Sequence, residues 1–223
     1  DSEIRSLILN KEIVMVMRHD EGTAAFRWYI KNGYNIISEI LSLKMNIKPK
    51  INDDKKNYEI IQKNDIPKHS KNLLRIFNRH NDNKFNYPER SINSWQNRIE
   101  FHYYKNFYKF FIILSKLENG EKIFAILGET SIKDNIFRID ILEISCPENE
   151  ADLTSFFEKI QHFAKERKVD QIRIQVAKYD KLKNIALKYG FKLRWKTNLM
   201  SKSLNDKNNV SKIDTRFFQI DYV

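Results

Sequence analysis

Tyr29 is the side chain in this sequence whose type and spacing best suit chemistry. It lies in the stretch AFRWYIKNGY, within a predicted helix over about 23–32 that follows an apolar strand at 13–17 and ends at Gly33. A phenol with a pKa of about 10 can act as a general acid in a dry, tuned site, and such catalysis is worth about 10²–10⁴ in rate. The alternative is that Tyr29 only packs beside the other aromatic residues of its helix.

The pattern around Gly33 recurs around Gly190, 157 positions later. Residues 13–47 and 172–204 each contain a short apolar strand, a loop, an amphipathic helix, a glycine followed by an aromatic residue, and an extended segment with a methionine. A repeat spaced by the length of a domain predicts a duplicated fold. We therefore expect two related units whose chemistry differs where their residues differ.

Composition predicts a folded intracellular protein. The 223 residues are 41% hydrophobic and include 15 Phe and 10 Tyr, which is enough apolar material for a core. The single cysteine, Cys146, rules out an internal disulfide and fits a reducing compartment. Because no apolar run reaches about 18 residues, we expect no transmembrane helix, no membrane partner and a cytoplasmic location.

The formal net charge of +11 raises the question of an acidic partner such as a nucleic acid. The lysines are spread along the chain, however, and the aromatic, zinc-ligand and basic-heptad motifs of nucleic-acid binders are missing. The simpler explanation is a Lys- and Asn-rich composition with solvated charged faces. A nucleic-acid partner thus has no support from any motif.

Polar and apolar stretches divide the chain into four segments. Residues 48–57 (KPKINDDKKN) are polar and charged and contain Pro49, so we place a linker at 49–57. The linker separates the C-terminal part of a first unit, 1–48, from a complete second unit, 58–204. A tail, 205–223, follows, and its last residues RFFQIDYV could add a final strand.

The second unit alternates strand and helix patterns. Runs of β-branched and aromatic residues predict strands, and apolar stripes at a period of 3.6 predict helices. In the first unit, residues 2–9 have the pattern of the last turns of a helix. The predicted order in the second unit is a strand (58–62), helices opening near Asp65 and after Pro88, a meander (107–117, 122–132, 136–146), a helix to about 168, a strand (172–177), a helix (180–189) and one or two strands over 191–204. This order predicts an α/β fold with a mixed sheet.

Five residues of the first helix match a known pattern. Ala25, Tyr29, Lys31, Gly33 and Tyr34 agree with Ala-x-x-x-Tyr-x-Lys-x-Gly-[Phe/Tyr]. With the order of elements, this resembles the GNAT superfamily of acetyl-CoA-dependent N-acetyltransferases, and specifically the C-terminal part of a tandem-GNAT protein. The resemblance implies a mixed, mostly antiparallel sheet flanked by helices, duplicated, with a partial first copy.

The resemblance also implies roles for residues of the first unit. Tyr29 would be the general acid that protonates the departing CoA thiolate. Acetyl-CoA, as a substrate, would lie along the strand 13–17 and the start of the helix, with its sulfur near the Tyr29 hydroxyl. Gly22 stands where the family places an Asn that contacts the pantetheine arm, so only backbone contact remains there. The residues implied in cofactor binding are Met15, Val16, Met17, Gly22, Thr23, Ala25 and Phe26.

The second unit departs from the family at its cofactor positions. The turn 146–152 (CPENEAD) should hold the pyrophosphate on backbone N–H groups, but it has no glycine, contains Pro147 and carries three acids. Ala186 stands where the tyrosine would be. We therefore expect this unit to keep the fold without the usual cofactor chemistry.

The first unit is incomplete by the same comparison. Its pyrophosphate turn would precede Asp1, so either the native protein is longer or this unit lacks the phosphate site. The strand 13–17 is too apolar for an exposed edge. We expect both of its sides to be covered, by upstream sequence, by the second unit or by another copy of the chain in a homo-oligomer.

The leading hypothesis is an enzyme that moves an acetyl group from acetyl-CoA to an amine-bearing acceptor of unknown type, with catalysis in the first unit. The alternative is a non-catalytic GNAT-fold scaffold or interaction module, and a weaker third is a nucleic-acid-associated protein. We expect no metal, because the five histidines lack metal-ligand spacing with cysteine or carboxylates.

Overall fold

One eight-stranded sheet runs through the part of the chain that the structure describes. The structure, a computed structural model, describes residues 13–18, 22–47, 57–81, 91–97, 99, 109–132, 136–147, 149–178 and 180–203. The strand order is β1-β8-β2-β7-β6-β5-β4-β3. Neighbouring strands are antiparallel except for β6 and β7, which are parallel. The sheet is thus mixed and mostly antiparallel, as the sequence predicts.

The strands have bounds close to those predicted, and the predicted meander is present. They are β1 (Ile13–Arg18), β2 (Asn35–Asn46), β3 (Tyr58–Gln62), β4 (Lys109–Lys116), β5 (Lys122–Ile132), β6 (Ile136–Ser145), β7 (Gln171–Ala177) and β8 (Lys192–Ser203). The segment expected to give one or two strands over 191–204 forms the single strand β8.

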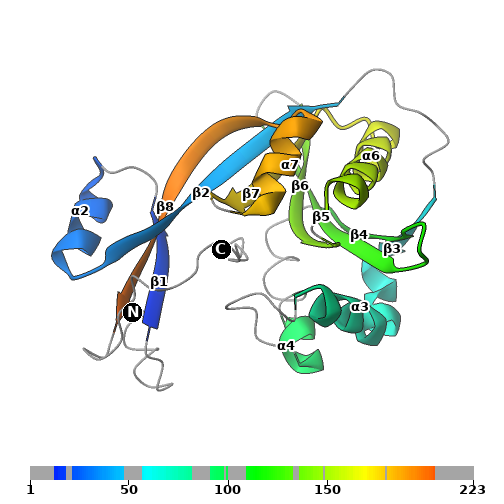
Figure 1. The fold of residues 1–223 in the computed structure, drawn as a ribbon, viewed down its shortest axis with the longest axis horizontal. Coiled ribbons are helices and arrows are strands. Elements are labelled where there is room, and N and C mark those ends of the chain that lie inside the picture. Colours follow the sequence, from blue (N-terminus) through cyan, green and yellow to red (C-terminus); the bar gives the residue numbers. More distant parts are fainter. Residues whose placement is uncertain are drawn as a thin grey trace.

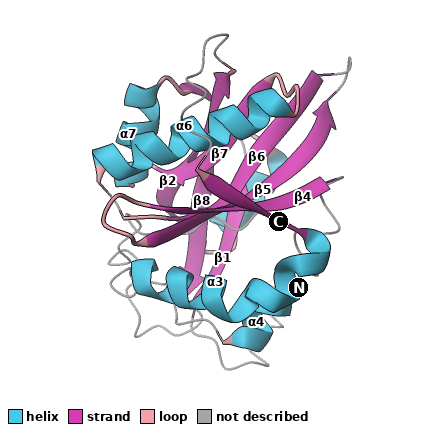
Figure 2. Ribbon diagram, turned by 90° about the vertical axis from the view of Figure 1, so that its right-hand side faces the viewer, coloured by secondary structure: helices cyan, strands magenta, loops and turns pink. Residues whose placement is uncertain are grey.

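Helices cover both faces of the sheet (Figures 1 and 2). Figure 2 shows α6 and α7 on one face and α3 and α4 on the other. The helices are α2 (Ala24–Lys31), α3 (Ile66–Asn81, after the 3₁₀ turn η2 at Lys63–Asp65), α4 (Ile92–Asn97), α6 (Glu150–Glu166) and α7 (Lys181–Tyr189).

Local sequence explains where the helices start and stop. The Thr23 hydroxyl accepts a hydrogen bond from the Phe26 N–H at the start of α2, and the Asn149 side chain accepts one from the Asp152 N–H at the start of α6. Asp180 caps α7 in the same way. Gly190 ends α7 with φ of 120°, a conformation that favours glycine.

Each face of the sheet has its own core. One core lies under α6 and α7 and includes Leu43, Ile141, Phe157 and Ile174. The other lies under α3 and α4 and is built around fully buried Trp95. Because β2 contributes Leu43 and Met45 to the first core, the first and second units share it.

The two repeats form a reciprocal pair. Shifted by 157 positions, the bounds of β2 become those of β8, and α2 falls on the first eight residues of α7. β2 pairs with β7 and β8, while β8 pairs with β1 and β2, so each repeat exchanges its last strand with the other. The irregularities in the β2–β8 ladder fall at 37 and 194, which are also 157 apart. Duplication of the complete unit stays a prediction, because β3 to β6 occur once in the described residues.

Some expectations fall outside the described residues: the helix end at 2–9, the linker apart from Asn57, and the final strand at 216–223. The sheet continues across the predicted boundary between units, since β2 lies between β7 and β8. As expected, β8 covers one side of β1. A partner for its other side stays a prediction. No helix in the described part of the chain is long and apolar enough to cross a membrane.

Candidate active site

Tyr29 lies on α2 within a small aromatic cluster. Its ring meets Trp28 edge-on with centroids 5.0 Å apart and Tyr34 with centroids 4.8 Å apart. The half-buried side chain packs against a group of buried residues formed by Phe26, Tyr34 and Met200, the last of which belongs to β8. The ring is therefore fixed by both repeats while part of it remains accessible.

The residues implied in cofactor binding lie on β1 and at the start of α2. Met15, Val16 and Met17 pair with Ser201, Met200 and Leu199 of β8. The structure therefore holds these three residues in a ladder with the strand that also supports the Tyr29 cluster.

The start of α2 has no acidic side chain in its first turn. Thr23 caps the helix, Phe26 is buried in the cluster, and Ala25 and Gly22 are exposed. The Gly22 carbonyl accepts a hydrogen bond from Arg27 Nη1 at 3.0 Å. Of the α2 residues implied in cofactor binding, only Phe26 touches the Tyr29 cluster directly.

The parallel strands of the second unit separate along their length. The ladder between β6 and β7 begins where Arg138 pairs with Gln171. It ends where Ile141 pairs with Ile174. Beyond that point β6 continues to Ser145 and β7 to Ala177. The ladder from β6 to β5 skips Leu142, since Ile141 pairs with Leu127 and Glu143 with Ile126. A bulge of this kind bends a strand and re-aims its side chains.

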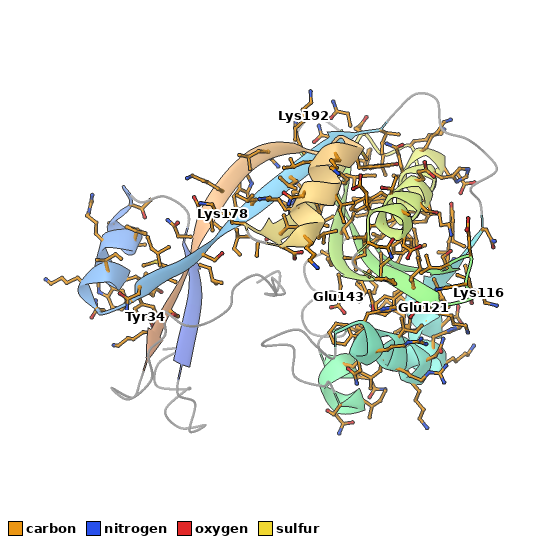
Figure 3. The ribbon with its side chains drawn as sticks, viewed as in Figure 1. Tyr34, Lys116, Glu121, Glu143, Lys178 and Lys192 are labelled. Atoms are coloured by element: carbon orange, nitrogen blue, oxygen red, sulfur yellow. The ribbon has the colours of Figure 1, made fainter. Side chains whose placement is uncertain are left out.

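Glu143 follows this bulge and is the main residue that the sequence reasoning missed. Its side chain is buried, and its pairing with Ile126 places it on the face of α3 and α4 (Figure 3). A buried carboxylate next to separating strands could accept a proton from an amine that attacks a carbonyl. The sequence signal was the adjacent pair Ile141-Leu142, which breaks the alternation of the strand.

An ion cluster holds the paired part of β6 and β7 together. Asp140 is fully buried and accepts two hydrogen bonds from Arg173, at 2.7 and 2.9 Å. Arg138 Nη2 donates to the same carboxylate at 3.0 Å. This cluster ties β6 and β7 together just before their pairing ends. It therefore sets the point from which the two strands separate.

Polar side chains at the start of α6 bind one another and α7. Asn149 caps the helix, and Glu150 forms an ion pair with Lys188 of α7 at 2.7 Å. Negative charge in a first turn stabilises a helix but opposes a bound pyrophosphate. That the turn 146–152 does not hold CoA stays a prediction.

The tyrosine position of the second unit has no phenol. Ala186 is fully buried, and the nearby Tyr189 stacks on Phe157 and Phe191. Burial, together with the charge of Glu158, raises the pKa of Tyr189 above its ordinary value. This phenol is therefore a poor proton donor compared with an accessible one.

Among the described residues, no group of three or more His, Cys, Asp and Glu side chains could hold a metal ion.

Comparison with known proteins gives relatives by structure only. No protein-family model and no curated protein matches the sequence. A GCN5-related N-acetyltransferase from Anabaena variabilis has a TM-score of 0.60 at 13% identity, over 91% of this chain and 48% of that one. A GCN5-related N-acetyltransferase from Sphaerobacter thermophilus gives 0.55 at 10% identity, over 93% and 66%.

N-myristoyltransferase from Saccharomyces cerevisiae with bound myristoyl-CoA is also similar. Its TM-score is 0.58 at 9% identity, over 98% of this chain and 62% of that one. The chain thus spans about half to two thirds of the length of these acyltransferases. The eight-stranded sheet, its single parallel pair among the described strands and the helices on both faces therefore give this chain a GNAT-like fold.

Proposed function

We propose that this chain transfers an acetyl group from acetyl-CoA to an amine, and that Tyr29 of the first repeat is the general acid. The observation that carries the proposal is the contrast between equivalent positions. Tyr29 is half-buried in an aromatic cluster at one end of the sheet, while its counterpart Ala186 is sealed under α6. The structural neighbours support acyl transfer in general.

The chemistry requires a proton at the departing sulfur. An amine attacks the thioester carbonyl, the carbon–sulfur bond breaks, and the thiolate takes the phenol proton of Tyr29. The nitrogen gives up one proton to water, and the phenolate regains one from water, so the amide and the free thiol leave with Tyr29 restored. A phenol can supply this proton where water is excluded, and the aromatic neighbours of Tyr29 remove part of the surrounding water.

The donor would lie between β1 and the start of α2. Met15 to Met17 would contact the pantetheine arm, while Gly22 and Thr23 would approach it closely. The first turn of α2 has no acidic side chain, in contrast to the first turn of α6. A CoA molecule is therefore expected at the first repeat and not at the turn 146–152.

The reciprocal repeats also suggest what completes this site. β7 has the parallel strand β6 on the side away from β2. The equivalent position beside β1 would take a parallel strand from upstream sequence or from another copy of the chain. A cytoplasmic location, with access to acetyl-CoA, is part of the same proposal.

The test is CoA release from acetyl-CoA with a panel of amines, using Tyr29→Phe and, as the matched control, Tyr189→Phe. Tyr29→Phe should lower turnover about 10²–10⁴-fold with nearly unchanged affinity for acetyl-CoA, because only the proton is removed. Tyr189→Phe should change neither value. Unaltered turnover in Tyr29→Phe would remove the basis for this assignment.

A non-catalytic scaffold is the second candidate, and the second repeat favours it. The acids in the first turn of α6, the Glu150–Lys188 ion pair and the buried Ala186 all oppose cofactor chemistry there. A thermal-shift titration separates the two functions. Stabilisation by acetyl-CoA supports the enzyme, stabilisation by myristoyl-CoA alone changes the proposed donor, and no response to either favours the scaffold.

A further inference from the structure

A pocket of about 500 Å³ lies where β3 begins and β4 ends, far from the Tyr29 cluster. Figure 3 shows Lys116 and Glu121 at this end of the molecule and Tyr34 at the opposite end. A volume of this size suits a small-molecule ligand. The lining residues are Asn57, Tyr58, Glu59, Leu114, Ser115, Lys116 and Lys122.

Two lysines of this pocket face each other across the β4–β5 ladder. Lys116 and Lys122 are directly paired, so their side chains leave the sheet on the same face. Like charges in directly opposite positions destabilise a sheet. Their pairing is therefore unfavourable unless something anionic lies between them.

Two carboxylates lie near these lysines, and one of them, Glu59, lines the pocket. Glu121 forms an ion pair with Arg79 at 3.2 Å and lies 3.9 Å from His80. Glu59 lies 3.9 Å from His69. Neither Lys116 nor Lys122 forms an ion pair within the described ranges of the chain.

The backbone around the two lysines is held from both faces of the sheet. Buried Lys159 of α6 donates to the Ser115 hydroxyl at 2.6 Å and to the Lys116 carbonyl at 3.3 Å. His80 of α3 contacts the Lys122 carbonyl at 3.1 Å. These contacts hold in place the backbone at the end of β4 and at the start of β5, and so preorganise the pocket.

We propose that this pocket binds a small anionic ligand, with a phosphate or carboxylate group between Lys116 and Lys122. The ammonium groups would each donate a charge-assisted hydrogen bond to the anion, which removes their mutual repulsion. A concave site with two accessible lysines fits a small ligand. A nucleic acid would instead require basic residues spread over a longer surface. The inference does not depend on Tyr29 or on acetyl transfer.

The test is isothermal titration of the whole chain with inorganic pyrophosphate and, separately, with citrate. The variant is Lys116→Ala/Lys122→Ala, and the control with the same charge change is Lys181→Ala/Lys183→Ala on α7. One or both probes should bind the unmodified chain and the control equally well. The pocket variant should bind at least about tenfold more weakly, since hydrogen bonds to charged groups are lost.

The two probes separate the possible sources of the anion: pyrophosphate binding alone indicates a phosphate ligand, and citrate binding alone a carboxylate ligand. The thermal midpoint of the pocket variant without ligand should stay the same or rise, which shows that the variant is folded. Equal affinity in variant and control, or no binding of either probe to the unmodified chain, overturns the proposal. Loss of acetyl-CoA binding in the pocket variant would also overturn it, because the pocket would then belong to the cofactor site.

Discussion

Ile40 of β2 lies directly opposite Thr197 of β8, and these two residues are themselves 157 positions apart. The pair therefore lies where the two repeats meet. On either side of it, Ser38 pairs with Leu199 and Ser42 with Trp195. The equivalent of each serine, 157 positions later, is the partner of the other serine. The pairing therefore stays the same when the two repeats are exchanged. The exchange of strands makes the first repeat part of the same sheet as the second.

The first prediction concerns the independence of the predicted units. A protease site placed in 50–55 should allow cleavage without separation of the fragments, because β2 remains between β7 and β8. The fragments should co-elute in size-exclusion chromatography under native conditions and separate only in denaturant. Separate elution of two folded fragments would contradict the single sheet.

The second prediction compares two equivalent positions of the repeats. Trp28 is 54% exposed on α2, while Ile185, 157 positions later, is 8% exposed under α6. Ile185→Ala should lower the free energy of unfolding by about 2–4 kcal/mol, and Trp28→Ala by less than about 0.5 kcal/mol. Urea denaturation measures both values.

A large fall in the free energy of unfolding in Trp28→Ala would contradict this comparison. It would show that another copy of the chain covers α2 in solution as α6 covers α7. The same experiment therefore tests the expectation that the first repeat is completed by further polypeptide.

The third prediction concerns the ion cluster between β6 and β7. Asp140→Ala leaves Arg138 and Arg173 in a mostly buried site without their shared carboxylate. The free energy of unfolding should fall by about 3–5 kcal/mol. Asp65→Ala, which breaks an exposed ion pair with Lys68, should cost less than about 1 kcal/mol in the same assay. Similar losses in the two variants would show that the cluster is solvated.

The fourth prediction concerns pH. Hydrogen bonds from Lys178 and then Lys196 lower the pKa of Glu39 below its ordinary value of 4.5. A carboxyl whose pKa is lower in the folded state stabilises the protein above about pH 4.5, and this stabilisation disappears as the pH falls through the folded value. Glu39→Gln should therefore lower the thermal midpoint by about 2–4 °C at neutral pH, the shift expected for about 1 kcal/mol, and by much less in acid.

Differential scanning calorimetry of Glu39→Gln across about pH 3–8 checks this dependence. The matched control is Glu118→Gln, an exposed residue in the β4–β5 hairpin. A difference from the unmodified chain that stays constant with pH would contradict the assignment to the two lysines.

The sequence by itself determined the local elements and the repeat. The strand Tyr58–Gln62, the meander and α6 follow from alternation, turn residues and a continuous apolar stripe, which act over a few neighbours. The equivalence of Gly33 and Gly190 follows from their helices, since a glycine after each helix accepts a positive φ, observed as 81° and 120°. The motif around Tyr29 was likewise visible in ten consecutive residues.

Only the tertiary structure decided how the repeats combine. Pairing of β2 with β7 joins residues more than 120 positions apart. The residue pattern of a strand does not specify which other strand it will pair with. The burial of Glu143, the ion pair of Glu150 with Lys188, and the opposed Lys116 and Lys122 depend on the same long-range pairing and packing. Local sequence thus sets which residues form strands and helices, while the energy of non-local contacts sets which side chains meet.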